Sequence, residues 1–428
     1  MPTPLLAPRY GAVKLIEDES AFASAVDEII AGEGPIAIDA ERASGFRYSQ
    51  RAYLIQIFRR GGGLHLIDPI PLANSPQIAR LHNALINEEW VIHASTQDLP
   101  CLREFGISPQ RLFDTELAAR LAGCERVGLG PLTESLLELS LAKEHSAVDW
   151  SHRPLHDDWL TYAALDVDVL LDLRDAVETL LTEQGKLEWA QADFAAILKT
   201  PAPQPRKDPW RRTSGMHTVR DRRALAIVKE LWEKRDEIAR EIDLAPGRLL
   251  NDSLIVTLAL KQPRTLSELL AISSFARGRN DVQRSYFEEW VKAVLRVDSL
   301  QQSELPELRV KSDGMPPTKV WRDKFPEAYA RFTHARAALT TLATELSMPI
   351  ENLISPDSYK RICWLSQSEP SLIGNREEVA ERLAEFGARF WQIDHVAPLL
   401  AQALCESEPI ELPEPETDKT PENQAISE

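Results

Sequence analysis

Short apolar runs separated by longer amphipathic stretches characterise the first 200 residues. The run 35–40 (Pro-Ile-Ala-Ile-Asp-Ala) follows a Gly-Glu-Gly turn and predicts a short buried strand. Two further runs, 53–59 and 64–68, flank three consecutive glycines and predict a hairpin, and a fourth strand is expected at 90–94. Strands that come first and then alternate with helices are typical of a mixed α/β sheet. Helices are predicted at 76–88, 97–105, 114–122, 131–139 and about 156–184.

Beyond residue 200 the pattern is almost entirely helical. Three prolines within 200–205 predict a stiff, extended linker, and a second proline-containing break spans 303–317. The helical blocks on either side of the second break share an outline, which suggests a duplicated module. The acidic, proline-containing tail 408–428 is expected to be disordered. Helices are predicted at 216–241, 251–261, 265–272 and 281–296 before the second break, and at 326–346, 350–354, 357–366 and 375–404 after it.

Composition limits the class of protein. The 428 residues suffice for two to four domains of ordinary size. The longest apolar stretch, 254–260, is far shorter than the roughly 20 residues of a membrane span. The N-terminus lacks the pattern of a secretory signal, and the four cysteines form no CxxC pair. We therefore expect a cytoplasmic protein without a membrane partner.

The charge is unevenly distributed along the chain. The formal net charge is −17, yet residues 201–300 carry +5, whereas residues 1–200 carry −13. This distribution suggests carboxylate chemistry in the first half and contact with a polyanion in the basic middle.

Acidic residues form three motifs in the first half. Asp39 and Glu41 end the strand at 35–40, where residues two apart point the same way, so both carboxylates can reach one metal. Asp98 follows the strand at 90–94 and lies in the first turn of the next helix, where it could also serve only the helix dipole. Tyr162 and Asp166 share one face of a long helix.

A matched pair within the sequence shows how weak a single motif is. Asp114 and Glu116 have the same spacing as the first motif but open a helix, where they are expected to cap its N-terminus. The order of the three motifs is more specific than any one of them.

A strand-borne DxE, then HxxxxDL after a later strand, then YxxxD on a helix resemble the tyrosine subclass of the DEDD exonuclease superfamily. Within it, the segments 39–56, 66–69, 113–115 and 149–155 look like the ribonuclease D family. Residues 231–240 and 246–269 resemble the helicase-and-ribonuclease-D C-terminal (HRDC) domain, and 348–356 resembles its looser second copy.

The resemblance implies a ribonuclease H-like exonuclease domain, a mixed sheet with helices on both faces, followed by two all-α HRDC-type domains. The expected limits are 1–199 for the exonuclease domain, 200–212 for a basic linker, 213–298 for the HRDC domain, 299–318 for a second linker, 319–407 for the HRDC-like domain and 408–428 for the tail.

The implied activity is metal-dependent 3′–5′ exoribonuclease action that releases 5′-nucleoside monophosphates, in tRNA or other stable RNA processing or in RNA turnover. By the resemblance, Tyr162 orients the attacking water, and two divalent ions are held by Asp39, Glu41, Asp98 and Asp166. Oxygen ligands without cysteine or histidine suit Mg²⁺ or Mn²⁺ rather than zinc. We expect His93 to be a structural residue at a strand end and the protein to be a monomer.

Basic residues are predicted to hold the RNA. Arg42, Arg47 and Arg51 follow the first motif and are interpreted as a rim that faces phosphates. Trp210 could stack on a base, although an anchor that packs the linker onto a domain is favoured. The densest basic run of the chain supplies the other predicted contacts, which are Arg206, Lys207, Arg211, Arg212, Arg220, Arg222 and Arg223.

Two alternatives stay open. A 3′–5′ DNA exonuclease is one, because the superfamily includes proofreading enzymes and helicases share the HRDC domain; no GxxxxGK[ST] helicase motif occurs, however. A non-catalytic nucleic-acid-binding adaptor is the other, and the complete set of four carboxylates and the tyrosine opposes it.

Overall fold

The computed structural model describes residues 2–10, 14–141, 148–201, 204, 206–276, 281–309 and 314–412. Most of the predicted tail, 413–428, and three residues of the predicted linker, 202, 203 and 205, lie outside this part. The chain forms two compact units. The first consists of Met1–Ala118, Arg126–Leu180 and Phe194–Lys311, and the second of Ala119–Glu125, Leu181–Asp193 and Ser312–Glu428.

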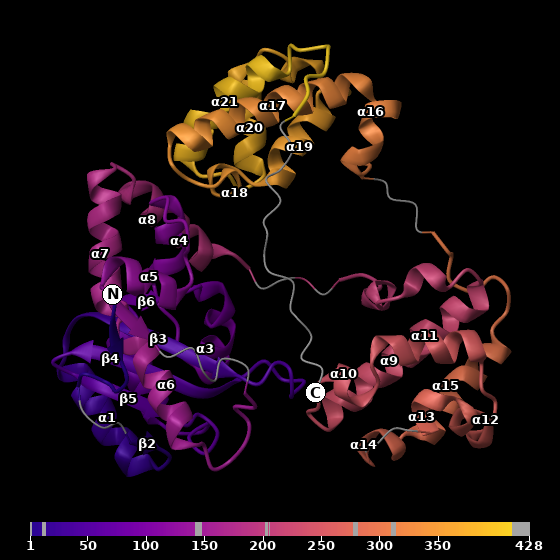
Figure 1. Ribbon diagram of the computed structural model, residues 1–428, viewed down its shortest axis with the longest axis horizontal. Coiled ribbons are helices and arrows are strands. Elements are labelled where there is room, and N and C mark those ends of the chain that lie inside the picture. The colour runs from indigo at the N-terminus through magenta and orange to yellow at the C-terminus, as the bar shows by residue number, and fades with distance from the viewer. Residues whose placement is uncertain are drawn as a thin grey trace. The chain divides into compact units, whose positions relative to one another are not determined.

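A six-stranded mixed sheet forms the centre of the N-terminal part of the chain (Figure 1). Its strands lie in the order β2-β5-β4-β3-β6-β7. β3, β4 and β5 pair antiparallel, whereas β2–β5, β3–β6 and β6–β7 pair parallel. β1 and β8 form a separate parallel pair. The strand bounds are β1 Thr3–Leu5, β2 Leu15–Ile16, β3 Glu33–Arg42, β4 Ala52–Arg60, β5 Gly63–Ile67, β6 Glu89–Ile92, β7 Arg111–Asp114 and β8 Leu139–Leu141.

The predicted strands and hairpin are confirmed, and four strands were missed. The hairpin turns at Gly61 and Gly63, whose positive φ values of 74° and 81° favour glycine. The missed strands β1, β2, β7 and β8 have two to four residues, which are too few to show alternation. β4 is buried over all but its last residue, so both faces of the sheet are covered there.

Helices pack around the sheet, and α6 crosses β3, β4 and β5. The single helix predicted at 156–184 was wrong, because it is two helices that break at Val169. Arg9 explains the break, since its Nη2 donates to the carbonyl of Asp168 at 2.7 Å and its Nε to the carboxylate at 2.5 Å. The bounds are α1 Glu19–Ala31, α2 Gln77–Leu85, α3 Leu99–Phe105, α4 Thr115–Leu121, α5 Leu129–Leu136, α6 Asp157–Asp168, α7 Leu170–Glu183 and α8 Leu187–Lys199.

The helical part of the first unit is organised on a long helix, α9. It begins at Arg222, later than predicted, because the Asp221 carboxylate caps it by accepting from the Ala224 N–H at 2.9 Å. Trp210 is buried in the core of this part, which agrees with an anchoring role. The bounds are α9 Arg222–Glu241, α10 Pro246–Leu249, α11 Asp252–Lys261, α12 Leu266–Ala271, α13 Ser273–Ala276, α14 Asp281–Arg284 and α15 Phe287–Arg296.

The second unit combines C-terminal helices with two segments from the first half of the chain. The buried Lys186 ammonium donates to the carbonyls of Leu121 and Leu346, at 2.8 and 2.5 Å. The helix predicted at 375–404 is divided at Gly387, which has a φ of 82°. The bounds are α16 Trp321–Lys324, α17 Pro326–Glu345, α18 Ile350–Leu353, α19 Pro356–Leu365, α20 Arg376–Glu385 and α21 Phe390–Ala403.

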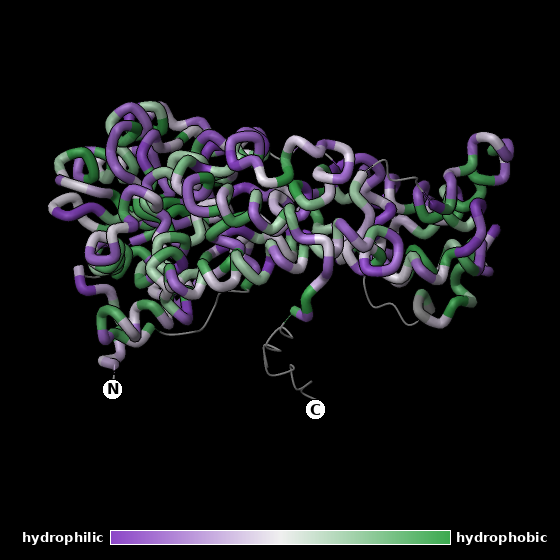
Figure 2. Tube along the Cα trace, turned by 90° about the horizontal axis from the view of Figure 1, so that it is seen from above, coloured by the Kyte–Doolittle hydropathy of each residue, from purple (hydrophilic) through white to green (hydrophobic). Residues whose placement is uncertain are grey.

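Polar and apolar residues are interspersed along the helices (Figure 2). Within the described ranges, no helix has the length and apolar character needed to cross a membrane.

One ion pair ties the loop before α6 to the sheet. The Arg153 guanidinium makes a two-pronged contact with the buried Asp68 carboxylate, at 2.7 and 2.9 Å. It also donates to the carbonyls of Tyr53 and Trp150. Two of the segments that resemble ribonuclease D, 66–69 and 149–155, are therefore joined by this arginine.

We predict that Arg153→Met lowers the unfolding free energy of this part of the chain by about 3 kcal/mol, because it leaves a buried carboxylate unpaired. Hydrogen exchange of the β4 and β5 amides measures the change. Arg264→Met, which breaks the exposed pair with Asp298, should cost less than about 1 kcal/mol. Unchanged protection of β4 and β5 in Arg153→Met would contradict the proposed importance of the pair.

Candidate active site

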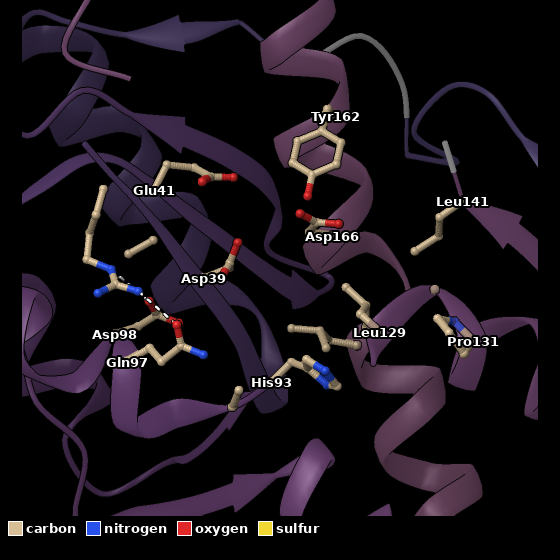
Figure 3. Close-up of a pocket in the computed structure, with 15 residues that line it drawn as sticks. Asp39, Glu41, His93, Gln97, Asp98, Leu129, Pro131, Leu141, Tyr162 and Asp166 are labelled. Atoms are coloured by element: carbon tan, nitrogen blue, oxygen red, sulfur yellow. Dashed lines mark hydrogen bonds and ion pairs between the residues drawn. The ribbon is translucent and has the colours of Figure 1, made fainter. Parts of the chain in front are cut away.

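Three elements bring the predicted acidic residues to one cavity (Figure 3). Asp39 and Glu41 lie near the end of β3, Asp166 lies on α6, and Asp98 immediately precedes α3. The cavity has a volume of about 550 Å³. Carboxylate oxygens of Asp39, Glu41 and Asp166 lie within 4.8 Å of one another, and Asp98 lines the same cavity. The structure thus brings together all four predicted metal ligands.

The Asp98 turn is held by Asp114, whose second role the sequence did not reveal. One Asp114 oxygen accepts from the Leu117 N–H at 3.0 Å, which confirms the predicted cap of α4. The other accepts from the backbone N–H and the hydroxyl of Ser95, at 2.8 and 2.7 Å. Ser95 begins the short 3₁₀ turn Ser95–Gln97, which leads directly into Asp98. The contact with Asp114 therefore fixes the position of the backbone at Asp98.

Arg42 lies beside the carboxylates, as predicted for a residue of the rim. Its guanidinium is 3.6 Å from the Asp98 carboxylate and donates to the Gln97 side chain at 3.1 Å. Arg42 therefore offsets part of the negative charge, although one arginine faces four carboxylates.

Burial and mutual repulsion dominate the electrostatics of the cavity. Burial, followed by the charge of Asp39, raises the pKa of Asp98 to about 8, although Arg42 acts in the opposite direction. Burial and neighbouring carboxylates also raise the pKa values of Glu41 and Asp166 well above the ordinary range. Burial raises the pKa of Asp39. A hard divalent cation relieves this repulsion, and oxygen donors are its preferred ligands.

Tyr162 faces the carboxylates from α6, with its hydroxyl directed at Asp166 (Figure 3). The phenol hydrogen-bonds the Asp166 carboxylate. Burial and the charge of Asp166 raise the pKa of Tyr162, so the phenol stays protonated at physiological pH.

An apolar wall lies across the cavity from Glu41 (Figure 3), and it was not predicted from the sequence. Such a wall suits the base and ribose of a nucleotide whose phosphate faces the carboxylates. The sequence indicates this wall only weakly, because the leucines and the proline that α5 and β8 contribute are irregularly spaced. The wall consists of Leu129, Pro131, Leu141 and Leu170.

His93 lines the cavity and follows β6 directly. Its Nδ1 is 2.9 Å from the Thr115 hydroxyl. This contact links the end of β6 to α4, which is consistent with a structural role at the strand end.

The other predicted basic residues do not line the cavity. Arg47 donates to the Ser151 hydroxyl at 2.7 Å, and Arg51 is 3.6 Å from Asp243. Arg222 and Arg223 bind backbone carbonyls within the helical part. The half-buried Arg211 lies over the Trp210 ring. The exposed members of the basic run are Arg206, Lys207, Arg212, Arg220 and Arg223.

The helical part of the first unit binds the loop that follows β3. Asp243 accepts from the Ser49 N–H at 2.8 Å, and Asp236 from the Tyr48 hydroxyl at 3.0 Å. Arg248 donates to the Gly45 carbonyl at 2.7 Å. Because β3 carries Asp39 and Glu41, the helical part supports the chain directly after the strand that bears these two carboxylates. No motif in the sequence predicts this contact, either in the loop after β3 or in the helical part.

The fold and the carboxylate site define a 3′–5′ exonuclease of the DEDD type. Residues 13–182 match the 3′-5′ exonuclease family, 224–294 the HRDC domain, and 314–404 the 3′ to 5′ exonuclease C-terminal domain. The chain is 31% identical to ribonuclease D of Acidiphilium cryptum, over 73% of this chain and 79% of the relative. It therefore belongs to the ribonuclease D family and is a 3′–5′ exoribonuclease.

Solved structures agree with this assignment. A protein from Bifidobacterium adolescentis is 38% identical and superposes with a TM-score of 0.86, over 94% of this chain and 100% of the other. Escherichia coli RNase D, described as an exoribonuclease involved in structured RNA processing, is 25% identical with a TM-score of 0.61, over 87% and 98% of the two chains.

The raised pKa values predict how metal-free stability depends on pH. A carboxyl group whose pKa is raised by folding binds its proton more tightly in the folded state, so its contribution to stability is complete below the unfolded value of about 4 and is lost as the pH rises. For Asp98 this loss extends to about pH 8. Asp166→Asn should therefore melt higher than the wild type in EDTA at pH 8 and gain less from added Mn²⁺.

Thermal melting in EDTA and in Mn²⁺, at pH 6 and pH 8, measures both effects. The wild-type gain from Mn²⁺ should be larger at pH 8, where more of the carboxylates must carry charge. Glu241→Gln, an exposed acid at the end of α9 that does not line the cavity, serves as the control and should behave as the wild type. An Asp166→Asn protein that melts lower than the wild type in EDTA at pH 8 would contradict the repulsion argument.

Proposed function

We propose that the enzyme removes 5′-nucleoside monophosphates one at a time from RNA 3′ ends, using two divalent cations, Mg²⁺ or Mn²⁺. The observation that carries the proposal is the convergence of Asp39, Glu41, Asp98 and Asp166 on one cavity. These residues would hold the cations. When bound, the cations would stabilise the charge that develops on the attacking and leaving oxygens of the phosphodiester.

The protein's own groups position the reactants. The Tyr162 phenol, directed at Asp166, can orient a water molecule but does not accept its proton, because the raised pKa of Tyr162 keeps the phenol protonated. Arg42 is placed to meet a substrate phosphate at the edge of the cavity, and the apolar wall is placed to hold the terminal base and ribose. Together these groups select the end of a chain for hydrolysis.

RNA upstream of the 3′ end is proposed to contact basic residues. Arg42, Arg47 and Arg51 form the rim, and the exposed residues of the run between Arg206 and Arg223 provide phosphate contacts. Because Arg222 and Arg223 bind carbonyls inside the helical part, we assign less of the binding to them than to Arg206, Lys207, Arg211, Arg212 and Arg220.

The helical block at 319–407 is proposed to be a second HRDC-like domain. The helices α9, α10 and α11 have 20, 4 and 10 residues, and α17, α18 and α19 repeat the same lengths in the same order. This repetition supports the duplicated module. The domain limits 1–199, 213–298 and 319–407 remain predictions.

Structured RNA, with tRNA precursors as one candidate, is the proposed substrate class, supported by the likeness to Escherichia coli RNase D. A DNA exonuclease is less favoured, because the family relatives are ribonucleases. We also propose that the enzyme acts as a monomer in the cytoplasm; the free thiols of its four cysteines suit a reducing compartment.

RNA labelled at the 3′ or the 5′ end, digested with Mg²⁺, Mn²⁺ or EDTA, tests the proposal. A 3′ label should appear at once in a mononucleotide, a 5′ label in a ladder of shortening products, and EDTA should stop both. Asp39→Asn and Asp98→Asn should abolish hydrolysis and remain folded, because each removes charge that the cations need at nearly constant volume.

Glu116→Gln is the matched control, since Glu116 has the DxE spacing but does not line the cavity, and it should retain activity. A DNA oligomer of the same sequence should be degraded more slowly. Wild-type turnover by Asp39→Asn or Asp98→Asn at saturating Mg²⁺ would refute the ligand assignment.

Tyr162→Phe should lower kcat by about 10²–10⁴-fold and change the KM for RNA little, because the phenol positions water rather than substrate. Steady-state kinetics on a short oligomer measures both constants. An unchanged kcat with a strongly raised KM would instead make Tyr162 a stacking residue.

A further inference from the structure

Gln56 occupies a position that the proposed mechanism does not use. It lies on β4, directly opposite Asp39 on β3 in the antiparallel pairing. Side chains of directly opposed residues project from the same face of a sheet, with their Cβ atoms about 5 Å apart. The Gln56 carboxamide and the Asp39 carboxylate are therefore neighbours on one face.

That face is largely apolar and is covered by α6. Leu66, which pairs with Gln56 on its other side, and Leu54, two residues before it, belong to one apolar cluster with Ala163 and Ala164 of α6. α6 also carries Asp166. Gln56 thus lies beneath the helix that delivers a metal ligand and beside the strand that delivers two more.

The Gln56 side chain is fully buried, with an exposed fraction of 0%. Neither its amide nitrogen nor its amide oxygen has a hydrogen-bond partner among the residues that the structure describes. Burying an amide without partners costs about 1–3 kcal/mol. A leucine at this position would extend the surrounding cluster without that cost, so packing alone does not account for a glutamine.

We propose that Gln56 is a positioning residue for the metal site, whose amide N–H donates to the Asp39 carboxylate when divalent cations are bound. Carboxylates that ligate metals are commonly oriented by a hydrogen bond from a second residue. In the metal-free state Asp39 accepts from the backbone N–H of Ala40. A carboxylate offers about four acceptor positions, so one oxygen can face a cation while the other accepts from Gln56.

The proposal rests on the proposed function, which includes the metal site, but the binding of Mn²⁺ can be measured without RNA. Gln56→Met keeps the length of the side chain and removes both polar atoms. We expect it to raise the dissociation constant for Mn²⁺ by about 10–100-fold, as is typical for loss of such a partner. Titration of free Mn²⁺ by electron paramagnetic resonance, with the full-length protein and no RNA, measures this constant.

Stability provides the second measurement. Gln56→Met in EDTA should melt at or above the wild-type temperature, because it removes an unpartnered buried amide. Gln392 provides the matched control: it is also buried, but its amide donates to the Asn352 carbonyl at 3.0 Å and accepts from the Arg389 N–H at 3.0 Å. Gln392→Met should melt lower and bind Mn²⁺ as the wild type does.

Wild-type Mn²⁺ affinity in Gln56→Met would overturn the proposal. Gln56→Leu is measured in parallel, and failure of both variants to fold would assign Gln56 to the fold rather than to the metal site. At saturating Mn²⁺, the KM for RNA should be unchanged in Gln56→Met. If Mn²⁺ binding weakens but no variant or wild-type protein degrades RNA, the metal-site proposal stands and the proposed function fails.

Discussion

The mutual repulsion of four carboxylates, one buried and three half-buried, is the constraint on which the active site depends. Asp39, Glu41, Asp98 and Asp166 would not stay together in one cavity unless surrounding packing held them there. That packing is supplied by β3, which is paired on both sides in the sheet, and by α6, which crosses β3, β4 and β5. The stability of the sheet and helix thus maintains a charge arrangement that is unfavourable until cations bind.

Several polar contacts direct this packing at the points where the chain changes direction. Asp114 holds the turn before Asp98, Arg153 joins the loop before α6 to the sheet, and Arg9 ends α6 just beyond Asp166. Each contact pairs a charged side chain with backbone groups or with an opposite charge. The start of α3 and both ends of α6 are therefore fixed by hydrogen bonds rather than by apolar contacts alone.

The helical part of the first unit also helps to hold the carboxylates in place. Its contacts with Tyr48 and Ser49 hold the loop directly after the strand that carries Asp39 and Glu41. Asp243 adopts a positive φ of 48° at this contact, an uncommon conformation for aspartate. Burial opposes the charge of Asp243, but the hydrogen bonds from Ser49 and Tyr53 and the charge of Arg51 together lower its pKa, so its charge is retained at the contact. A domain expected to bind nucleic acid thus also supports the strand that carries Asp39 and Glu41.

The sequence alone predicted the four carboxylates and the tyrosine that the structure brings to one cavity, and most of the elements that carry them. Asp39 and Glu41 are two residues apart on a strand, and Tyr162 and Asp166 are four apart on a helix. Such short spacings can be recognised from the sequence without knowledge of the rest of the fold. The same is true of the hairpin at Gly61 and Gly63 and of the helix cap at Asp114.

Only the tertiary structure decided what depends on residues far apart in sequence. The break at Val169 follows from Arg9, about 160 residues earlier, and the hydrogen bonds of Arg222 and Arg223 to carbonyls near residue 300 follow from the packing of the helical part. The neighbourhood of Gln56 and Asp39 depends on strand register, which a single sequence does not specify. Contacts of this kind join particular residues of different elements. Apolar periodicity shows which face of an element is buried, but it does not show which residues that face contacts.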